Sequence, residues 1–434
     1  MMRKELLGRM FRTAAMIMIM SMLAGACSKN NGPEKPEDNT GQTTGPGGNG
    51  SGDQGGSGDQ GNSGNEGGSG DEGGNEGGTS GGDHGGSGDS GDQGGSGDSG
   101  SGGSGDQGDQ PKPQITANSW MTAIDDDTKI ALLTIPGTHD AATSTCAGPG
   151  KCQTLTISGQ LEHGVRAFDL RPTMNDNSTL GNIYHSILDT GVSMGNAMEY
   201  FDSFLKAHPG EGIIVIMRYE SERQIFGSIA EDNYKTAMKN FLWDSRIYQS
   251  RMAAFNKSMT MKDLRGKILI ISRNDLSPVS TFETAYTQWS HSNSVGEALQ
   301  IYGTGGLGRI YVQDMYSAEK NGNSSEADFL AKKKELVCKL LDITVPFREH
   351  EQNNWVINYC SGYAGSSFAS DSYAKNAAST NPAALEHIRA HTGKGFTGIV
   401  MMDYAGTDTY EVGGSTFSVS GKSLTEALIM NNFQ

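Results

Sequence analysis

Apolar runs and amphipathic stretches alternate over the last roughly 320 residues of the chain. Short runs rich in Val, Ile and aromatic residues are typical of buried strands. Between several of these runs, apolar residues recur at helical spacing, as in 193–210, 230–243 and 326–342. The eight expected strands are 129–137, 165–172, 182–186, 212–220, 267–275, 309–316, 355–362 and 395–406.

Strands that alternate with helices predict a parallel α/β architecture, and eight such strands fit a (β/α)8 TIM barrel. We expect the barrel to be distorted, because the link from the second strand to the third is too short for a good helix. Pro136-Gly137 is interpreted as the turn that ends the first strand. The barrel domain is expected to span 115–434.

Polar residues follow nearly every expected strand. In a parallel barrel these carboxyl ends converge on one face, where active sites form. A polar residue at one strand end is unremarkable, and His139 alone would more often be a structural histidine. The residues at the ends are His139 with Asp140, Asp169 with Arg171, His185, Arg218, Arg273, Asp314 with Tyr316, and Asp403.

This set of side chains suits acid-base catalysis on a phosphodiester. One histidine can begin neutral and the other protonated, because the unperturbed pKa of imidazole lies near neutrality. A carboxylate bonded to a ring N–H fixes the tautomer. A guanidinium binds two phosphoryl oxygens without a metal ion.

The segments "IPGTHDAAT", "GVRAFDLRP" and "YHS", in this order, resemble the catalytic X-region of phosphatidylinositol-specific phospholipases C, especially the secreted bacterial enzymes. "MTMKDLRGKILIISR" and "YVQDMY" are similar to later stretches of the same barrel. The resemblance covers essentially the whole domain from Ser119 onward. It implies a distorted TIM barrel that converts phosphatidylinositol to diacylglycerol and inositol 1,2-cyclic phosphate.

The resemblance also implies a role for each matching position. His139 corresponds to the base that deprotonates the inositol 2-hydroxyl, and His185 to the acid that protonates the diacylglycerol oxygen. Arg171 matches the phosphate contact, and Asp403 matches the carboxylate that orients the base. Asp140 and Asp169 match supporting carboxylates, and Arg218, Arg273, Asp314 and Tyr316 match inositol-binding positions. A lysine often stands at the position of Arg218, and Arg273 could instead close its strand with a salt bridge.

No cofactor is expected, and the second strand gives the reason. Calcium-dependent relatives carry acidic or amide ligands there, whereas this chain reads "FDLRP". The guanidinium of Arg171 would repel a bound calcium ion. The sequence therefore predicts a calcium-independent enzyme that works as a monomer on membranes containing phosphatidylinositol.

Two other functions stay open. A glycerophosphodiester phosphodiesterase is also a barrel that uses two histidines, but it is expected to carry His-Arg near its first strand and acidic metal ligands. A barrel that has lost catalysis could still bind inositol or a glycan. The presence of base, acid, arginine and orienting carboxylate argues against this second alternative.

Composition sets the N-terminal part apart. Residues 41–110 hold about half of the 62 glycines and about three quarters of the net charge of −16, without Lys or Arg. We interpret 28–114 as a disordered, solvated linker. The acidity therefore belongs to the linker, and nothing in the chain indicates nucleic-acid binding.

Residues 1–27 are predicted to be a lipoprotein signal peptide. A basic start, a short apolar core and "LAGAC" resemble a bacterial lipobox with Cys27 as the lipidated residue. An ordinary secretory signal is the alternative. The lipobox predicts export and anchoring to the outer membrane at the cell surface.

A disulfide between Cys146 and Cys152 is plausible in an exported protein. Trp243, Phe255 and Trp289 are candidate aromatic residues for docking on a membrane.

Overall fold

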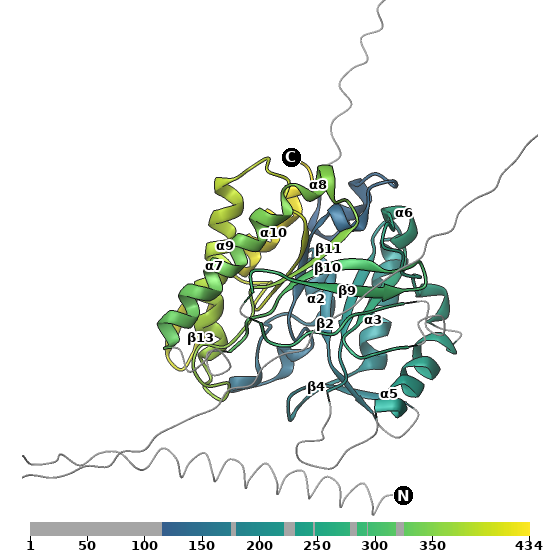
Figure 1. Cartoon of the computed structure of the whole chain (residues 1–434). Coiled ribbons are helices and arrows are strands. Elements are labelled where there is room, and N and C mark those ends of the chain that lie inside the picture. The colour runs from purple at the N-terminus through teal and green to yellow at the C-terminus, as the bar shows by residue number, and fades with distance from the viewer. Residues whose placement is uncertain are drawn as a thin grey trace, which may run out of the picture. The chain divides into compact units, whose positions relative to one another are not determined.

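The computed structural model describes residues 115–174, 179–220, 231–245, 248–277, 284–292, 294–317 and 325–434 (Figure 1). The predicted signal peptide with Cys27 and the predicted linker 28–114 lie outside the described residues. In the described part of the chain, no helix combines the length and the apolar character needed to cross a bilayer.

A closed barrel of nine strands forms the centre of this part of the chain, in the order β1-β12-β11-β10-β9-β8-β7-β6-β2. Neighbouring strands are parallel except at β9, which is antiparallel to both β8 and β10. The strands are β1 Thr134–Thr138, β2 Ala167–Leu170, β6 Ile213–Met217, β7 Ile268–Ser272, β8 Ala285–Tyr286, β9 Glu297–Gly303, β10 Gly308–Gln313, β11 Asn354–Tyr359 and β12 Gly398–Met402.

Helices pack around the outside of the barrel, and α7, α9 and α10 lie together on one side of it (Figure 1). The helices are α2 Ile157–Glu162, α3 Met194–Ala207, α5 Glu231–Met238, α6 Met261–Leu264, α7 Glu326–Thr344, α8 Phe347–His350, α9 Ser372–Ala390 and α10 Gly421–Asn431. Short helical turns are η1 Ala117–Ala123, η2 Ile130–Leu132, η3 Thr143–Thr145, η4 Gly148–Gly150, η5 Lys239–Trp243 and η6 Gln249–Arg251. Between β7 and β10, the described residues contain no helix.

Two small antiparallel sheets lie outside the barrel. The first contains β3 Pro172–Met174, β4 Leu180–His185 and β5 Leu188–Ser193. The second is the hairpin of β13 Thr409–Val412 and β14 Ser415–Ser418. The first sheet follows β2, in the link that is too short for a good helix. The chain leaves the barrel there and returns through α3.

The distorted TIM-barrel class is confirmed, and the three expected helices correspond to α3, α5 with η5, and α7. Seven of the eight expected strands belong to the barrel. The run 182–186 belongs instead to β4 of the side sheet, and β8 and β9 were not predicted. These two strands are short or partly exposed, so they lack the continuous apolar run by which buried parallel strands are recognised.

The prediction that Pro136-Gly137 ends the first strand is wrong. Both residues lie within β1, where Pro136 pairs with Val400 and Gly137 pairs with Met401 on β12. A side chain at Gly137 would place its Cβ 2.4 Å from Met401 Sδ. The glycine therefore allows close approach of neighbouring strands rather than a turn.

The disulfide considered between Cys146 and Cys152 is not formed, since both thiols are free. Cys152 is fully buried. Its backbone N–H donates to Thr143 Oγ1 at 3.1 Å, and its carbonyl accepts from the Tyr404 N–H at 2.8 Å. These bonds fix Cys152 against the segment that follows β12, while Cys146 is half-buried.

Candidate active site

The polar residues predicted at the strand ends meet at the carboxyl end of the barrel. Eight of the nine barrel strands run in the same direction, so their carboxyl ends open on one face. Around this face, His139 follows β1, Arg171 follows β2, Arg218 follows β6, Arg273 follows β7, Asp314 follows β10 and Asp403 follows β12.

His139 is held at both ring nitrogens. Its Nδ1 lies 2.9 Å from Asp403 Oδ1, while its Nε2 lies 3.2 Å from Asp140 Oδ2 and 3.0 Å from Arg171 Nη2. Burial of the ring disfavours its protonation, but the carboxylates of Asp140 and Asp403 outweigh this effect and raise the pKa of His139 to about 9. A proton on Nδ1 is directed at Asp403, so Nε2 is the nitrogen that can exchange a proton with a ligand.

Arg171 lies between two carboxylates. Its Nη2 is 2.9 Å from Asp169 Oδ2, and its Nε is 3.1 Å from Asp140 Oδ1. Burial opposes the charge, yet Asp140 and Asp169 raise the pKa of Arg171 well above its usual value. The two carboxylates fix the plane of a cation that can bind phosphoryl oxygens.

His185 is the last residue of β4 and lies beside the same carboxylate. Its Nε2 is 3.4 Å from Asp140 Oδ2 and 3.1 Å from the Tyr373 hydroxyl. Its Nδ1 is 3.0 Å from the carbonyl oxygen of Gly150, which can only accept, so Nδ1 carries a proton. The same oxygen, Asp140 Oδ2, therefore lies close to the Nε2 atoms of both histidines.

Backbone strain is concentrated at these residues. Among the described residues, four non-glycine residues have a positive φ, and three of them are Asp140 at 44°, Ser186 at 56° and Tyr404 at 57°. Each directly follows His139, His185 or Asp403. Such conformations cost free energy and persist where surrounding contacts enforce them, often at functional sites.

A second group of side chains lies beside the first. The Arg273 guanidinium lies 4.1 Å from the Trp289 ring centroid and 3.6 Å from Asp314 Oδ2. The Trp289 indole N–H donates to Asp314 Oδ2 at 2.9 Å. Desolvation and the nearby cations Arg273 and Arg171 lower the pKa of Arg218. Three arginines thus share one region, and Asp314 offers acceptors for ligand hydroxyls.

Tyr316 is half-buried at the edge of this group. Its backbone N–H donates to His291 Nδ1 at 3.1 Å, and its ring meets the His291 ring edge-on at a centroid distance of 4.9 Å. The four predicted inositol-binding residues therefore all lie at the carboxyl ends of barrel strands. Their role in binding stays a prediction.

Three aromatic residues of the site were not predicted to belong to it. Tyr359 ends β11 and could have been found by the rule that selected the other strand ends. Tyr373 projects from α9, a helix that gave no signal of its own. Trp289 was assigned to membrane docking, but it is half-buried against Arg273. The membrane-docking prediction is wrong for Trp243 and Phe255, which are buried, and stays a prediction for Trp289.

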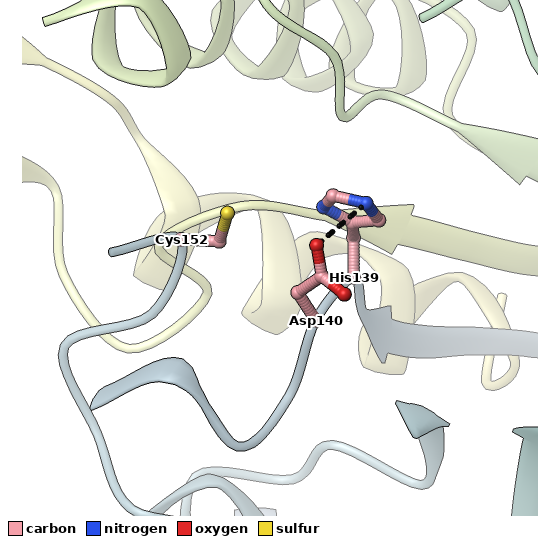
Figure 2. Close-up of side chains that lie close together, drawn as sticks. All are labelled: His139, Asp140 and Cys152. Carbon is pink, nitrogen blue, oxygen red and sulfur yellow. Dashed lines mark ion pairs between the residues drawn. The ribbon is translucent and has the colours of Figure 1, made fainter. Parts of the chain in front are cut away.

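His139, Asp140 and Cys152 lie close enough together to be tested as a metal site (Figure 2). A cysteine binds metal as the thiolate, and burial, with Asp403 and Asp140, raises the pKa of Cys152 well above its usual value. The guanidinium of Arg171 already lies beside His139 and Asp140. This donor set, with a protonated thiol and a fixed cation, does not suit a metal ion.

Known proteins similar to this chain include curated bacterial enzymes, although no family model matches it. It is 36% identical over 170 residues to the 1-phosphatidylinositol phosphodiesterase of Listeria monocytogenes, an alignment that covers 38% of this chain and 51% of that protein. The chain thus spans about half of that relative's length. It is 25% identical over 299 residues to the Staphylococcus aureus protein of the same name, covering 66% of this chain and 88% of that protein.

Solved structures show the same fold. A variant of the phosphatidylinositol-specific phospholipase C from Staphylococcus aureus matches with a TM-score of 0.57 and 24% identity, covering 73% of this chain and 96% of that one. The Listeria monocytogenes enzyme matches with a TM-score of 0.50 and 23% identity, covering 73% and 99%. The chain is therefore similar in sequence to bacterial 1-phosphatidylinositol phosphodiesterases and in fold to bacterial phosphatidylinositol-specific phospholipases C.

Proposed function

We propose that this protein is a phosphatidylinositol-specific phospholipase C, which cleaves the lipid to diacylglycerol and inositol 1,2-cyclic phosphate. The observation that carries the proposal is the arrangement of two histidines on one carboxylate. His139 and His185 lie 3.2 and 3.4 Å from Asp140 Oδ2, with Arg171 beside them. The sequence similarity to bacterial phosphatidylinositol phosphodiesterases supports the choice of lipid.

The first half of the reaction is a proton transfer to His139. In its neutral form His139 takes the proton of the inositol 2-hydroxyl at Nε2, while Asp403 stabilises the imidazolium through Nδ1. The 2-oxygen attacks phosphorus and closes the five-membered cyclic phosphate. Arg171 stabilises the negative charge on the phosphoryl oxygens.

The second half is protonation of the leaving group. Protonated His185 gives its Nε2 proton to the diacylglycerol oxygen as the phosphorus–oxygen bond breaks. The carbonyl of Gly150 holds Nδ1, and Tyr373 and Asp140 orient Nε2.

We propose that the reaction needs no calcium. The cation beside the reacting groups is Arg171, which is already paired with Asp140 and Asp169. Glycosylphosphatidylinositol anchors contain the same phosphodiester beside an inositol 2-hydroxyl, so we propose them as further substrates. The enzyme is proposed to act as a monomer at membrane surfaces that contain these lipids.

Incubating the purified protein with phosphatidylinositol and EDTA is expected to give inositol 1,2-cyclic phosphate at the rate measured without chelator. Phosphorus NMR distinguishes the cyclic product from the acyclic phosphate, and a second incubation measures release of an anchored protein. Absence of product from the folded protein would contradict the proposed function. Loss of activity in EDTA and recovery with calcium would contradict only the metal-free mechanism.

We further propose that the protein is exported and anchored through a lipid on Cys27, with 28–114 as the tether to the outer membrane at the cell surface. The lipobox-like "LAGAC" carries this proposal. Cys27→Ser is expected to move the protein from the membrane fraction to the soluble fraction and to abolish labelling by radioactive palmitate. Equal membrane retention of both forms would contradict it.

A further inference from the structure

Tyr359 carries a buried hydroxyl that the proposed mechanism does not use. The residue is 1% exposed, and within the described structure its hydroxyl oxygen has no hydrogen-bond partner. Leaving a buried polar atom unpaired is costly. Where such a hydroxyl borders a polar site, as at Tyr359, it can form the missing bond when a ligand binds.

The place of Tyr359 in the barrel is at the floor of the site. It is the last residue of β11 and belongs to the same apolar cluster as Ile357 and Met401. Its backbone carbonyl accepts from Gln313 Nε2 at 2.8 Å, which fixes the strand end. The side chain thus lies at the carboxyl end of the barrel interior and borders the reacting groups.

The Tyr359 ring lies between the two groups of the site. Its centroid is 6.3 Å from the His139 ring, edge-on, and 6.3 Å from the Trp289 ring. Trp289 in turn packs on Arg273 and bonds Asp314. Tyr359 therefore separates the predicted acid-base group from the predicted inositol-binding group.

The charges around the hydroxyl indicate what it can bind. Burial raises the pKa of Tyr359 well above its usual value; Asp169 and Asp314 add to this, whereas Arg273 and Arg171 oppose it. The group thus remains a neutral donor. A neutral polyol suits carboxylates and guanidiniums together, because each ligand hydroxyl can accept one hydrogen bond and donate another.

We propose that the Tyr359 hydroxyl is a substrate-binding group that donates a hydrogen bond to a ring hydroxyl of the inositol headgroup. This inference rests on the proposed function and adds a residue to it. The bond would link the floor of the barrel to the sugar ring. It would hold the 2-hydroxyl in line with His139.

The experiment compares Tyr359→Phe with Tyr234→Phe in the full chain. Tyr234 on α5 is the matched control, since it is 0% exposed and its hydroxyl also lacks a partner, while its ring stacks on Tyr219 in the core. Calorimetry with free myo-inositol is expected to show roughly five- to tenfold weaker binding for Tyr359→Phe, the range of one neutral hydrogen bond, and no change for the control. Neither variant should lower Tm, because each removes an unpaired buried hydroxyl.

Monodeoxy-inositols test whether the contact is direct. The analogue that lacks the contacted hydroxyl is expected to bind the wild type and Tyr359→Phe equally. The inference is overturned if Tyr359→Phe binds myo-inositol as tightly as the wild type, or if every analogue keeps the difference. If the wild type cleaves phosphatidylinositol and Tyr359→Phe binds myo-inositol as the wild type does, only this inference is contradicted. If the wild type neither cleaves phosphatidylinositol nor binds myo-inositol, both the proposed function and this inference are contradicted.

Discussion

Replacing His139 with glutamine is expected to lower kcat for phosphatidylinositol by roughly 10³- to 10⁴-fold, the upper part of the range for a general base. Glutamine can still bond Asp403, but it cannot accept the proton of the inositol 2-hydroxyl. The expected effect is on kcat, because the bound headgroup still meets Arg171 and Arg273. Initial rates of cyclic phosphate release at several lipid concentrations measure kcat and KM separately.

The control for this prediction is His350→Gln, an exposed histidine at the end of α8. It should keep wild-type kinetics. Circular dichroism and Tm must show that His139→Gln is folded, since the change removes a buried cation between two carboxylates. A folded variant that retains more than about a tenth of the wild-type kcat would show that His139 is not the base.

Asp403→Asn is expected to lower kcat/KM by roughly 10³-fold and to move the pH profile. The side chain of Asp403 holds the proton on His139 Nδ1, whereas an asparagine NH₂ can donate to Nδ1 and leave the proton on Nε2. His139 in that tautomer cannot accept a proton from the substrate. The remaining rate comes from Arg171 and from the other binding contacts.

The direction of the pH effect follows from the pKa of His139. Burial lowers this pKa, but Asp140 and Asp403 raise it to about 9 in the folded protein. The base works only when neutral, so the limb on which kcat/KM rises with pH follows the pKa of His139. Removing the Asp403 charge removes one of the two effects that raise the pKa, and the rising limb should therefore shift to lower pH.

A variant that only weakens the strand tests this interpretation. Met402→Ala truncates the buried residue before Asp403 and should cost about 2 to 5 kcal/mol of stability. It should lower kcat/KM less than Asp403→Asn and leave the rising limb where it is in the wild type. If Asp403→Asn leaves that limb in place, Asp403 does not control the protonation of His139.

His139 shows how much a single stretch of sequence can predict about a residue's role. A lone histidine after an apolar run is as compatible with a structural role as with catalysis. Its assignment as the base depended on "FDLRP", "YHS" and "MMDYAG", because a parallel barrel places the ends of distant strands side by side. The strand ends together with the resemblance to phosphatidylinositol-specific phospholipases C selected His139, Arg171, His185 and Asp403, although His185 lies on β4, outside the barrel.

Two of the aromatic residues of the site could not be selected in this way. Trp289 lies in a loop and Tyr373 on a helix, and neither residue type nor spacing distinguishes them from core or surface aromatics. Cys152 was considered for a disulfide with Cys146, yet the fold places its thiol beside His139 and Asp140. These positions depend on how loops and α9 close over the barrel, which local patterns do not specify.

The sequence by itself determined the barrel class, the three long predicted helices and the charged residues at the strand ends, because burial on a fixed period leaves a local pattern. Only the tertiary structure decided that β4 leaves the barrel and that β8 and β9 enter it. It also decided that Asp140 lies between both histidines and that the Tyr359 hydroxyl is buried without a partner. These features arise from contacts between segments distant in sequence, whose geometry is set by packing of the whole domain.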